Sequence, residues 1–470
     1  MADSQTIYDI AVLGAGPGGY TCAIRAAQLG LKIALIEKDP QLGGTCLHVG
    51  CIPTKALLFN AEVYDHVKAG KELGIEGIES PKLNWKTIQD GKTKIVQKHT
   101  KGLDFLMRKN KVDVIKGYGK ITGPAQNGIV TVDVEGKPVK TKNLVIATGS
   151  NARALGDLKF DDRVLSNIEI LSLPNIPRSM IVIGAGAVGV EFASIYKSFG
   201  TEVTIIEYAP RFVPAEDEDI GKELLRLYKK RGIDSYVSTK VEKVERTKDG
   251  VKVTFTPADG KQQVKEAETV LIAIGRAPRT ENIGLDKTKI KLDRGFITTD
   301  EWMQTGEPHI YAIGDIVAGM PQLAHVAGMQ GIVVATRVAG KWAKPVRRNR
   351  IPGCTYCEPQ IGSVGLTEAA AKEAGYKVKV GKFPFSANSK ASIVHSHDGF
   401  IKVVADEKYG EVLGVHIIGP QATELIAECV VALELEATVD ELMFTIHAHP
   451  TLSEGMLDAF SSVYGEAINI

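Results

Sequence analysis

Residues 7–19 read IYDIAVLGAGPGG and determine the expected fold. The apolar run that opens this stretch predicts a β-strand, and the glycines after it follow the spacing Gly14-x-Gly16-x-x-Gly19. In a turn between a strand and a helix, the first of three such glycines permits the tight turn. The second lets a pyrophosphate approach the backbone, and the third lets the helix pack on the strand. The stretch therefore predicts a βα turn that binds a dinucleotide.

The residues that follow complete this dinucleotide-binding pattern. Residues 20–29 predict a helix whose N-terminus offers free N–H groups to phosphate, and residues 32–36 predict a second strand. Glu37 ends that strand 23 residues after Gly14, where a carboxylate accepts hydrogen bonds from ribose hydroxyl groups. A tight βα turn without a ligand is the alternative, but the strand, the helix and the terminal acid together favour a binding site.

The same pattern occurs a second time. A further predicted strand leads into the spacing Gly184-x-Gly186-x-x-Gly189, and the next strand ends at Glu207, again 23 residues after the first glycine. Two complete patterns predict two dinucleotide sites. A carboxylate suits the free 2′-hydroxyl of NAD and repels a 2′-phosphate, so the second site favours NAD, although Arg211 lies only four residues further on.

Repeated strand ends predict how the two dinucleotide units are connected. LVIATG at 144–149 resembles VLIAIG at 270–275, and each is a short apolar strand that ends in glycine. YAIGD at 311–315 then fits a return to the first unit. We therefore expect an α/β fold with two Rossmann-like dinucleotide-binding domains, one inserted in the other. A linker at about 345–350 leads into an α+β C-terminal domain, with strands expected at 401–405 and 412–418 and a helix at 422–435.

Composition excludes several classes of function. Lys and Arg number 57 and Asp and Glu number 56, so the formal net charge is +1 and a general nucleic-acid binder or polybasic membrane protein is disfavoured. No transmembrane helix is expected, since no run of ~18 apolar residues occurs. Six cysteines are too few for a disulfide scaffold, and residues 1–6 show no targeting pattern, so a cytoplasmic protein is expected.

Two of the cysteines lie close together just after the first glycine pattern. Residues 43–57 read GGTCLHVGCIPTKAL, so four residues separate Cys46 from Cys51. A distorted turn can bring such a pair to the Cα separation of ~5–6 Å that a disulfide requires. A helix expected from Thr54 would favour thiolate near its N-terminus. Beside a dinucleotide site the pair is typical of a redox-active disulfide, and two buried structural cysteines are the alternative.

This cysteine segment resembles the active site of the dihydrolipoamide dehydrogenase family, the flavin disulfide reductases of 2-oxo acid dehydrogenase complexes. The resemblance extends over essentially the whole chain, through both glycine patterns, ATG at 147–149 and YAIGD, to HAHPTLSE at 447–454. It implies FAD at the first pattern, NAD as substrate at the second, and a homodimer. The expected domains are then 1–150 (FAD-binding, first part), 151–276 (NAD-binding), 277–347 (FAD-binding and central, second part) and 348–470 (dimerisation, or interface).

The C-terminal motif supplies a candidate base. By pattern alone, His447 and His449 fit a surface cluster, a weak metal site or a catalytic group. The resemblance selects His449 as the base that takes a thiol proton and Glu454 as the carboxylate that holds its ring, and it places both in the neighbouring subunit's site. It also implies that Cys46 exchanges with dihydrolipoamide and that Cys51 lies against the flavin.

The resemblance also implies cofactor contacts and partners. Lys55 resembles the family's lysine near the flavin N5, Glu191 its ion-pair partner, and Asp315 the residue at the FAD ribityl and pyrophosphate groups. The expected partners are an acyltransferase core of 2-oxo acid dehydrogenase complexes and a lipoyl domain as substrate, with no nucleic acid, membrane or metal. The expected contacts are Gly14, Gly16, Gly19, Glu37, Lys55, Gly119, Thr148, Gly149, Asp315 and Ala324 for FAD, and Gly184, Gly186, Gly189, Glu191, Glu207, Val241 and Gly275 for NAD.

Two other types of function remain as alternatives. Another flavin disulfide reductase is the first. Glutathione-type enzymes more often carry VPKK after the second cysteine and Arg near the second acid, where this chain has IPTK at 52–55 and Glu207. Mercuric-reductase and long thioredoxin-reductase types need a C-terminal cysteine pair, but the chain ends GEAINI. A scaffold subunit with a vestigial flavin fold is the second alternative, and the intact catalytic positions disfavour it.

The remaining cysteines are expected to be incidental. Cys354 and Cys357 have redox or zinc spacing, but no second pair completes a tetrahedral zinc site. Cys22 and Cys429 fall on apolar helix faces, which predicts that both lie in the core.

Overall fold

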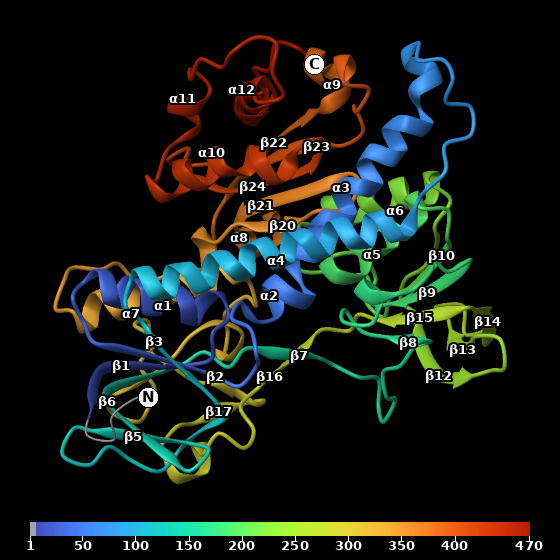
Figure 1. Cartoon of the computed structure of the whole chain (residues 1–470). Coiled ribbons are helices and arrows are strands. Elements are labelled where there is room, and N and C mark those ends of the chain that lie inside the picture. Colours follow the sequence, from blue (N-terminus) through green and yellow to red (C-terminus); the bar gives the residue numbers. More distant parts are fainter. Residues whose placement is uncertain (1–5) are drawn as a thin grey trace. The chain divides into compact units, whose positions relative to one another are not determined.

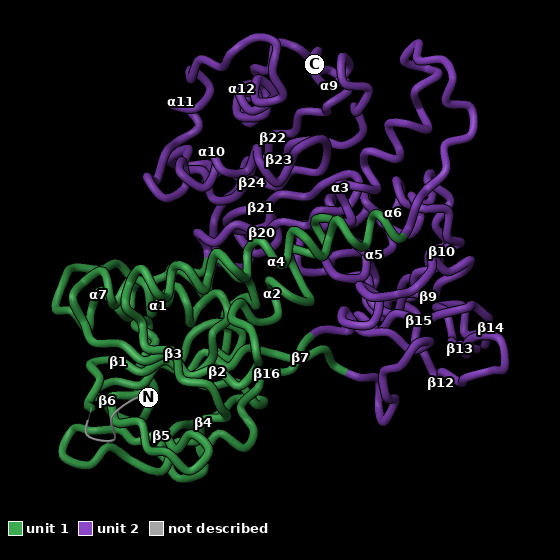
Figure 2. Tube along the Cα trace, in the orientation of Figure 1, with its two compact units in different colours: residues 1–56, 86–153, 276–348 green, residues 57–85, 154–275, 349–470 purple. Residues whose placement is uncertain are grey.

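The structure is a computed structural model that describes residues 6–470 (Figure 1). The chain forms two compact units (Figure 2). The first unit comprises Met1–Ala56, Lys86–Arg153 and Arg276–Arg348, and the second comprises Leu57–Trp85, Ala154–Gly275 and Asn349–Ile470.

The first unit is built on a sheet whose central strands are parallel. β1 (Ile7–Leu13) pairs with β2 (Ile33–Glu37) on one side and with β6 (Lys137–Ile146) on the other. β19 (Ile310–Ala312) also pairs with β6 in parallel, with Ile310 opposite Leu144. The chain therefore leaves this sheet after β6 and returns to it at β19, which confirms the predicted insertion. The outer strands are β3 (Asp113–Lys116), β5 (Val130–Val134) and β4 (Gly119–Ile121).

Two helices of the first unit pack closely on each other through small residues. α1 (Pro17–Gln28) lies so close to α7 (Ala324–Val338) that a Cβ built on Gly331 would lie 2.7 Å from the carbonyl oxygen of Gly18. Cys22 of α1 is fully buried in this core, as predicted. The other helices are α2 (Gly44–Val49), α3 (Cys51–Lys68), which continues into the second unit, and α4 (Trp85–Lys109). Short strand pairs are β7 (Ser150–Ala152) with β16 (Arg276–Pro278), and β17 (Leu292–Asp293) with β18 (Phe296–Ile297).

The second unit contains a parallel sheet of the same kind. β9 (Ser179–Ile183) pairs with β10 (Glu202–Ile206) and with β15 (Thr269–Ile272), so the second glycine pattern follows a central strand as the first one does. The other elements of this part are β8 (Val164–Leu165), β11 (Asp234–Tyr236), α5 (Ala187–Ser198), α6 (Glu218–Lys230) and the antiparallel strands β12 (Lys240–Arg246), β13 (Val251–Thr256) and β14 (Gln263–Ala267).

The C-terminal part of the second unit is an antiparallel sheet with helices, as expected for an α+β domain. Its central strand β24 (Val412–Gly419) is buried along its whole length, and Cys429 of α10 (Ala422–Glu434) lies in the same core, as predicted. The neighbouring elements are β20 (Gly353–Thr355), β21 (Gln360–Gly365), β22 (Val378–Pro384), β23 (Phe400–Asp406), α8 (Glu368–Glu373), α9 (Ser389–Ile393), α11 (Val439–Leu442) and α12 (Glu454–Ser461).

α1 and α3 begin earlier than the sequence pattern predicts. α1 begins at Pro17 rather than at residue 20, because proline at the first helical position needs no N–H partner and has a helical φ already. α3 begins at Cys51 rather than at Thr54, so the second cysteine is its first residue. In residues 6–470, no helix combines the length and the hydropathy that crossing a membrane requires.

Candidate active site

The first glycine turn contains two glycines that the fold itself requires and one that it does not. Gly14 has a φ of +108°, and a Cβ on Gly19 would lie 1.8 Å from the Gly14 carbonyl oxygen. Gly16 has an ordinary φ of −70°, and within residues 6–470 no heavy atom lies within 4 Å of a Cβ built on it. This open space at the start of α1 fits the close approach of a pyrophosphate, which a side chain would block.

A buried carboxylate stands beside this turn at the end of β2. Glu37 accepts a hydrogen bond from the Ala15 backbone N–H (2.7 Å) and another from the Asp39 N–H (2.8 Å). These bonds fix the carboxylate next to the turn, where the sequence places a ribose. Within the described chain no side chain caps α1, so its N-terminal N–H groups suit an anion.

The second glycine turn repeats this geometry. Gly184 has a φ of +103°, and a Cβ on Gly189 would lie 1.9 Å from the Gly184 carbonyl oxygen. A Cβ on Gly186 would again meet no heavy atom of residues 6–470 within 4 Å. The carboxylate of Glu207 accepts the Ala185 N–H at 2.5 Å. The residues at both turns therefore fit a dinucleotide for the same physical reasons.

The structure brings the two cysteines of the predicted redox pair together. Cys46 lies in α2 and Cys51 opens α3, and Gly50 between them has no room for a side chain, since its Cβ would lie 2.9 Å from the Thr45 carbonyl oxygen. The structure has no disulfide between them. The hydrogen bond to Cys51 and burial raise the pKa of the Cys46 thiol, while the Lys55 ammonium acts in the opposite direction. Cys46 therefore keeps its proton in the reduced pair.

The segment that carries the cysteines packs directly on the first glycine turn. The Gly43 N–H donates a hydrogen bond to the carbonyl of Ala15 (2.9 Å), and a Cβ on Gly44 would lie 2.8 Å from the Cα of Gly16. Gly43 and Gly44 have φ values of +121° and +60°. A thiol pair is thus held beside a dinucleotide turn within a single unit.

A polar cluster in the same unit surrounds Asp315. The Ser150 hydroxyl donates to the Asp315 carboxylate (2.5 Å) and accepts a hydrogen bond from Nε of Arg276 (2.6 Å). Burial lowers the pKa of Arg276, and the carboxylate of Asp315 opposes that shift. The sequence reasoning missed Ser150 and Arg276. Ser150 and Arg276 directly follow the two glycines that end the LVIATG and VLIAIG strands, and this shared position could have indicated them.

The other expected FAD contacts also lie in the first unit. The Thr148 hydroxyl donates to the carbonyl of Arg279 (2.6 Å), and the Gly149 carbonyl accepts the Arg279 N–H. Gly119 lies in β4, and Ala324 is the first residue of α7. Their contacts with FAD stay predictions.

The expected NAD contacts lie in the second unit. Val241 is in β12, and Gly275 has a φ of +106°. Glu191 is buried in α5 and accepts a hydrogen bond from the Tyr356 N–H (2.9 Å). Because Lys55 belongs to the first unit and Glu191 to the second, the pairing of these two residues stays a prediction.

His449 is hydrogen-bonded to the carboxylate that the sequence predicts as its partner. Its Nδ1 lies 2.8 Å from Oε1 of Glu454, and the side chain of His449 is 72% exposed. Hydrogen bonds from the Thr451 N–H and from the His449 ring lower the pKa of Glu454. Glu454 therefore stays ionised and can hold the imidazole while its other ring nitrogen remains available to a substrate.

His447 differs from His449 in its surroundings. Its Nδ1 lies 3.0 Å from the Thr445 carbonyl oxygen, its Nε2 lies 2.9 Å from Glu428, and its side chain is 7% exposed. Both ring nitrogens are therefore engaged within the chain. Within residues 6–470, no group of three or more His, Cys, Asp and Glu side chains is arranged to hold a metal ion.

The CxxC pair at 354–357 occupies a different environment from the redox pair. Cys357 is buried, and burial raises the pKa of its thiol. Its Sγ lies 3.1 Å from the Pro359 carbonyl oxygen, whereas the Sγ of Cys354 lies 3.9 Å from the carbonyl of Thr423. Both thiols thus point to backbone acceptors, and neither forms a disulfide.

Known proteins of one family match this chain over its whole length. The chain matches the pyridine nucleotide-disulphide oxidoreductase family over residues 8–331 and the dimerisation domain of the same family over 351–460. Dihydrolipoyl dehydrogenase of Zymomonas mobilis is 44% identical over 471 residues, covering 100% of both chains, and that of Bacillus subtilis is 44% identical over 475 residues, covering 99% of both. The crystal structure of LpdA from Mycobacterium tuberculosis superposes with a TM-score of 0.88 at 27% identity, covering 96% of this chain and 98% of that one. The chain therefore belongs to the pyridine nucleotide-disulphide oxidoreductase family, among the dihydrolipoyl dehydrogenases.

Proposed function

We propose that the chain oxidises the dihydrolipoyl group of a lipoyl domain to its disulfide and reduces NAD to NADH. The family uses FAD and NAD, and the two glycine turns fit one dinucleotide each. The observation that carries the proposal is the hydrogen-bonded thiol pair Cys46 and Cys51, which Gly43 and Gly44 pack against the first turn. FAD held at the first turn would supply the two-electron redox chemistry between this thiol pair and NAD.

The cysteine pair exchanges its disulfide with the substrate dithiol. His449 takes the proton of one substrate thiol, and the resulting thiolate attacks Sγ of Cys46, which breaks the Cys46–Cys51 bond and releases Cys51 as a thiolate. The second substrate thiol then attacks the substrate sulfur of the mixed disulfide. Its proton goes to the departing Cys46, while the first proton stays on His449. The products are a substrate disulfide and a reduced pair in which Cys46 holds a proton, the protonation that its raised pKa favours.

His449 of one subunit serves the cysteines of the other in this proposal. Residues 351–460 match a dimerisation domain, and they include His449 and Glu454. Phe444 and Ile446, which lie just before His449, are 79% and 94% exposed in the single chain. Exposed apolar side chains beside a catalytic histidine are explained if a second copy of the chain covers them.

NAD, rather than NADP, is the proposed nicotinamide substrate. The Glu207 carboxylate is buried beside the second turn, where it disfavours a 2′-phosphate. Arg211 is the nearby cation that would favour NADP, but its guanidinium donates to the carbonyl of Pro214 within its own loop (3.2 Å). This contact supports the preference for NAD.

The assembly and the domain limits complete the proposal. The FAD-binding domain spans 1–150 and 277–347, the NAD-binding domain spans 151–276, and the dimerisation domain spans 348–470. The homodimer acts in the cytoplasm with the acyltransferase core of a 2-oxo acid dehydrogenase complex, whose lipoyl domain delivers the substrate.

Two steady-state assays on the FAD-loaded protein test this function. We expect rapid NAD reduction by dihydrolipoamide and no NADPH-dependent reduction of glutathione disulfide. Activity with glutathione disulfide alone would assign the chain to another reductase type. Tightly bound flavin without either activity would favour the scaffold alternative.

A further inference from the structure

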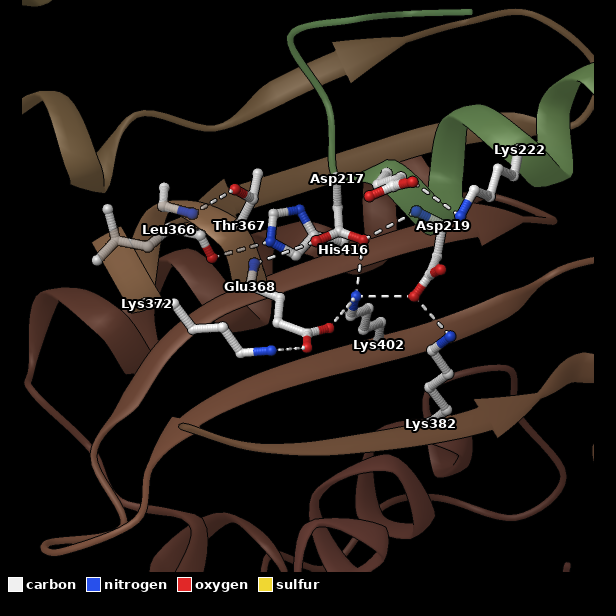
Figure 3. A network of polar contacts seen from close by, with 12 residues as sticks. Asp217, Asp219, Lys222, Leu366, Thr367, Glu368, Lys372, Lys382, Lys402 and His416 are labelled. Atoms are coloured by element: carbon white, nitrogen blue, oxygen red, sulfur yellow. Dashed lines mark hydrogen bonds and ion pairs between the residues drawn. The ribbon is translucent and has the colours of Figure 1, made fainter. Parts of the chain in front are cut away.

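A buried ion cluster in the second unit is centred on Lys402 of β23 (Figure 3). The side chain of Lys402 is 2% exposed, and its Nζ lies 2.8 Å from each of Asp217, Asp219 and Glu368. Burial opposes the charge of the ammonium, but hydrogen bonds to the three carboxylates outweigh it and raise the pKa of Lys402. The cluster therefore stays charged, and its three acceptors match the three N–H donors of the lysine.

Asp217 connects this cluster to the start of α6. It is the N-cap residue of that helix, and its carboxylate accepts the Asp219 N–H (3.1 Å) as well as the Glu368 N–H at the start of α8 (3.1 Å). Lys402 therefore fixes the first turn of α6 against the C-terminal sheet. Figure 3 shows the two aspartates reaching Lys402 from the α6 segment.

The loop that ends at Asp217 holds the second glycine turn. It begins after Glu207, and along it the Val213 N–H donates to the Ala185 carbonyl (2.9 Å). The Glu216 N–H, next to Asp217, donates in turn to the Val213 carbonyl (2.8 Å). Ala185 lies between the first two glycines of the turn, so its carbonyl is held by this loop and its N–H by Glu207.

Val213 makes this bond in a strained backbone conformation. Its φ is +40°, in the left-handed region that a β-branched residue avoids. At the first glycine turn the matching bond to the Ala15 carbonyl comes from Gly43, which adopts a φ of +121° without strain. A strained residue keeps its conformation only where its surroundings fix it, and the cluster at Asp217 fixes the chain four residues later.

We propose that Lys402 is a positioning residue for NAD. Through Asp217 it holds Val213 in the left-handed conformation, and Val213 in turn holds the Ala185 carbonyl and the second glycine turn. The inference rests on the proposed assignment of NAD to that turn. It makes a residue of the C-terminal sheet a determinant of nicotinamide dinucleotide affinity.

A double-mutant cycle on the FAD-loaded homodimer tests this coupling. The NADH dissociation constant is measured by isothermal titration calorimetry for Lys402→Met, Val213→Gly and the double variant, each reduced beforehand with dithionite so that NADH binds without transferring hydride. We expect Lys402→Met to weaken NADH binding about tenfold, the range that loss of a fixed strained residue implies, with the KM for dihydrolipoamide unchanged. Because glycine adopts this φ freely, Val213→Gly should remove most of the effect of Lys402→Met. Additive effects, or unchanged binding in Lys402→Met, overturn the proposal.

Three further variants keep the result interpretable. Asp217→Asn retains a good N-cap while weakening the ion cluster, so it replaces Lys402→Met if that variant does not fold, and it should weaken NADH binding in the same direction. Lys382→Met removes an exposed partner of Asp219 and should bind NADH normally. Gly186→Val fills the open space of the second turn. If Gly186→Val binds NADH normally, the proposed NAD site itself is wrong, whereas normal binding in Lys402→Met alone overturns only this inference.

Discussion

Replacing His449 by glutamine tests the proposed base. The imidazole is mostly exposed and makes one hydrogen bond, to Glu454, so the free energy of unfolding should change by only about 0.5 kcal/mol. A positioned general base typically raises a reaction rate by about 10²–10⁴-fold. The rate of exchange with dihydrolipoamide should therefore fall by about that factor, which corresponds to a barrier increase of about 3–5 kcal/mol. Rapid-mixing measurements of flavin reduction by dihydrolipoamide isolate this step from NADH release.

His447 supplies a matched control two residues away. It is almost fully buried and engages both ring nitrogens, so His447→Gln should lower the free energy of unfolding by about 1–3 kcal/mol, the cost of leaving Glu428 without its partner. Its exchange rate should nevertheless exceed that of His449→Gln. The two variants thus separate a catalytic loss from a structural loss.

Glu454→Gln tests the carboxylate partner of His449. An amide at this position no longer stabilises the protonated imidazole, so the exchange rate should fall by about tenfold, the low end for a charge-assisted hydrogen bond because the pair is exposed. A near-normal exchange rate in His449→Gln, or a slower rate in His447→Gln than in His449→Gln, would refute the assignment of the base.

Three more predictions concern the turns, the thiols and the ion cluster. Gly186→Ala should keep the free energy of unfolding within about 1 kcal/mol and yet weaken NADH binding, whereas Gly189→Ala should unfold, because its Cβ would lie 1.9 Å from a carbonyl oxygen; calorimetry with thermal melts distinguishes them. Cys46→Ser should abolish exchange with dihydrolipoamide while FAD stays bound, and loss of flavin in a spectrum of the purified variant would instead indicate a structural role. Burial opposes the charge of Asp219, but its two lysine partners lower its pKa to about 2 from 3.8. The stabilisation from this carboxylate is therefore fully present above the ordinary pKa of 3.8 and is lost as the pH falls towards 2. In chemical denaturation curves, the free energy of unfolding of Lys402→Met should depend less on pH in this range.

Local sequence patterns predict most of the fold, and they predict the parts of the candidate site that lie close together in the chain. The two glycine turns, Glu37 and Glu207 are encoded within stretches of about 30 residues, where strand, turn and helix signals reinforce one another. Cys46 and Cys51 are close in the chain, so their contact follows from local geometry as well. Element ends were less accurate, because a proline at the first helical position and a cysteine after Gly50 extend α1 and α3 towards their N-termini.

Contacts between distant residues were not predictable from a single sequence. Lys402 bonds to Asp217 across 185 positions, and Arg276 bonds to Ser150 across 126 positions. Neither pair leaves a periodic pattern, because a polar contact between distant residues is set by tertiary packing and not by the local period of a helix or strand. The left-handed conformation of Val213 could not be predicted either, because valine in a sequence normally indicates an extended strand.

The two glycine turns show why equal motifs do not make equal sites. Each turn holds its alanine carbonyl with a backbone N–H from the segment that follows the acidic strand end, but the donors differ in chemistry. At the first turn the donor is Gly43, and the chain continues at once into α2 with Cys46, so the turn and the thiol are built as one local structure. At the second turn the donor is Val213, which needs support from Asp217 and therefore from another sheet. The motif defines what can bind, and the segment after it determines whether that site is coupled to redox chemistry or to the C-terminal domain.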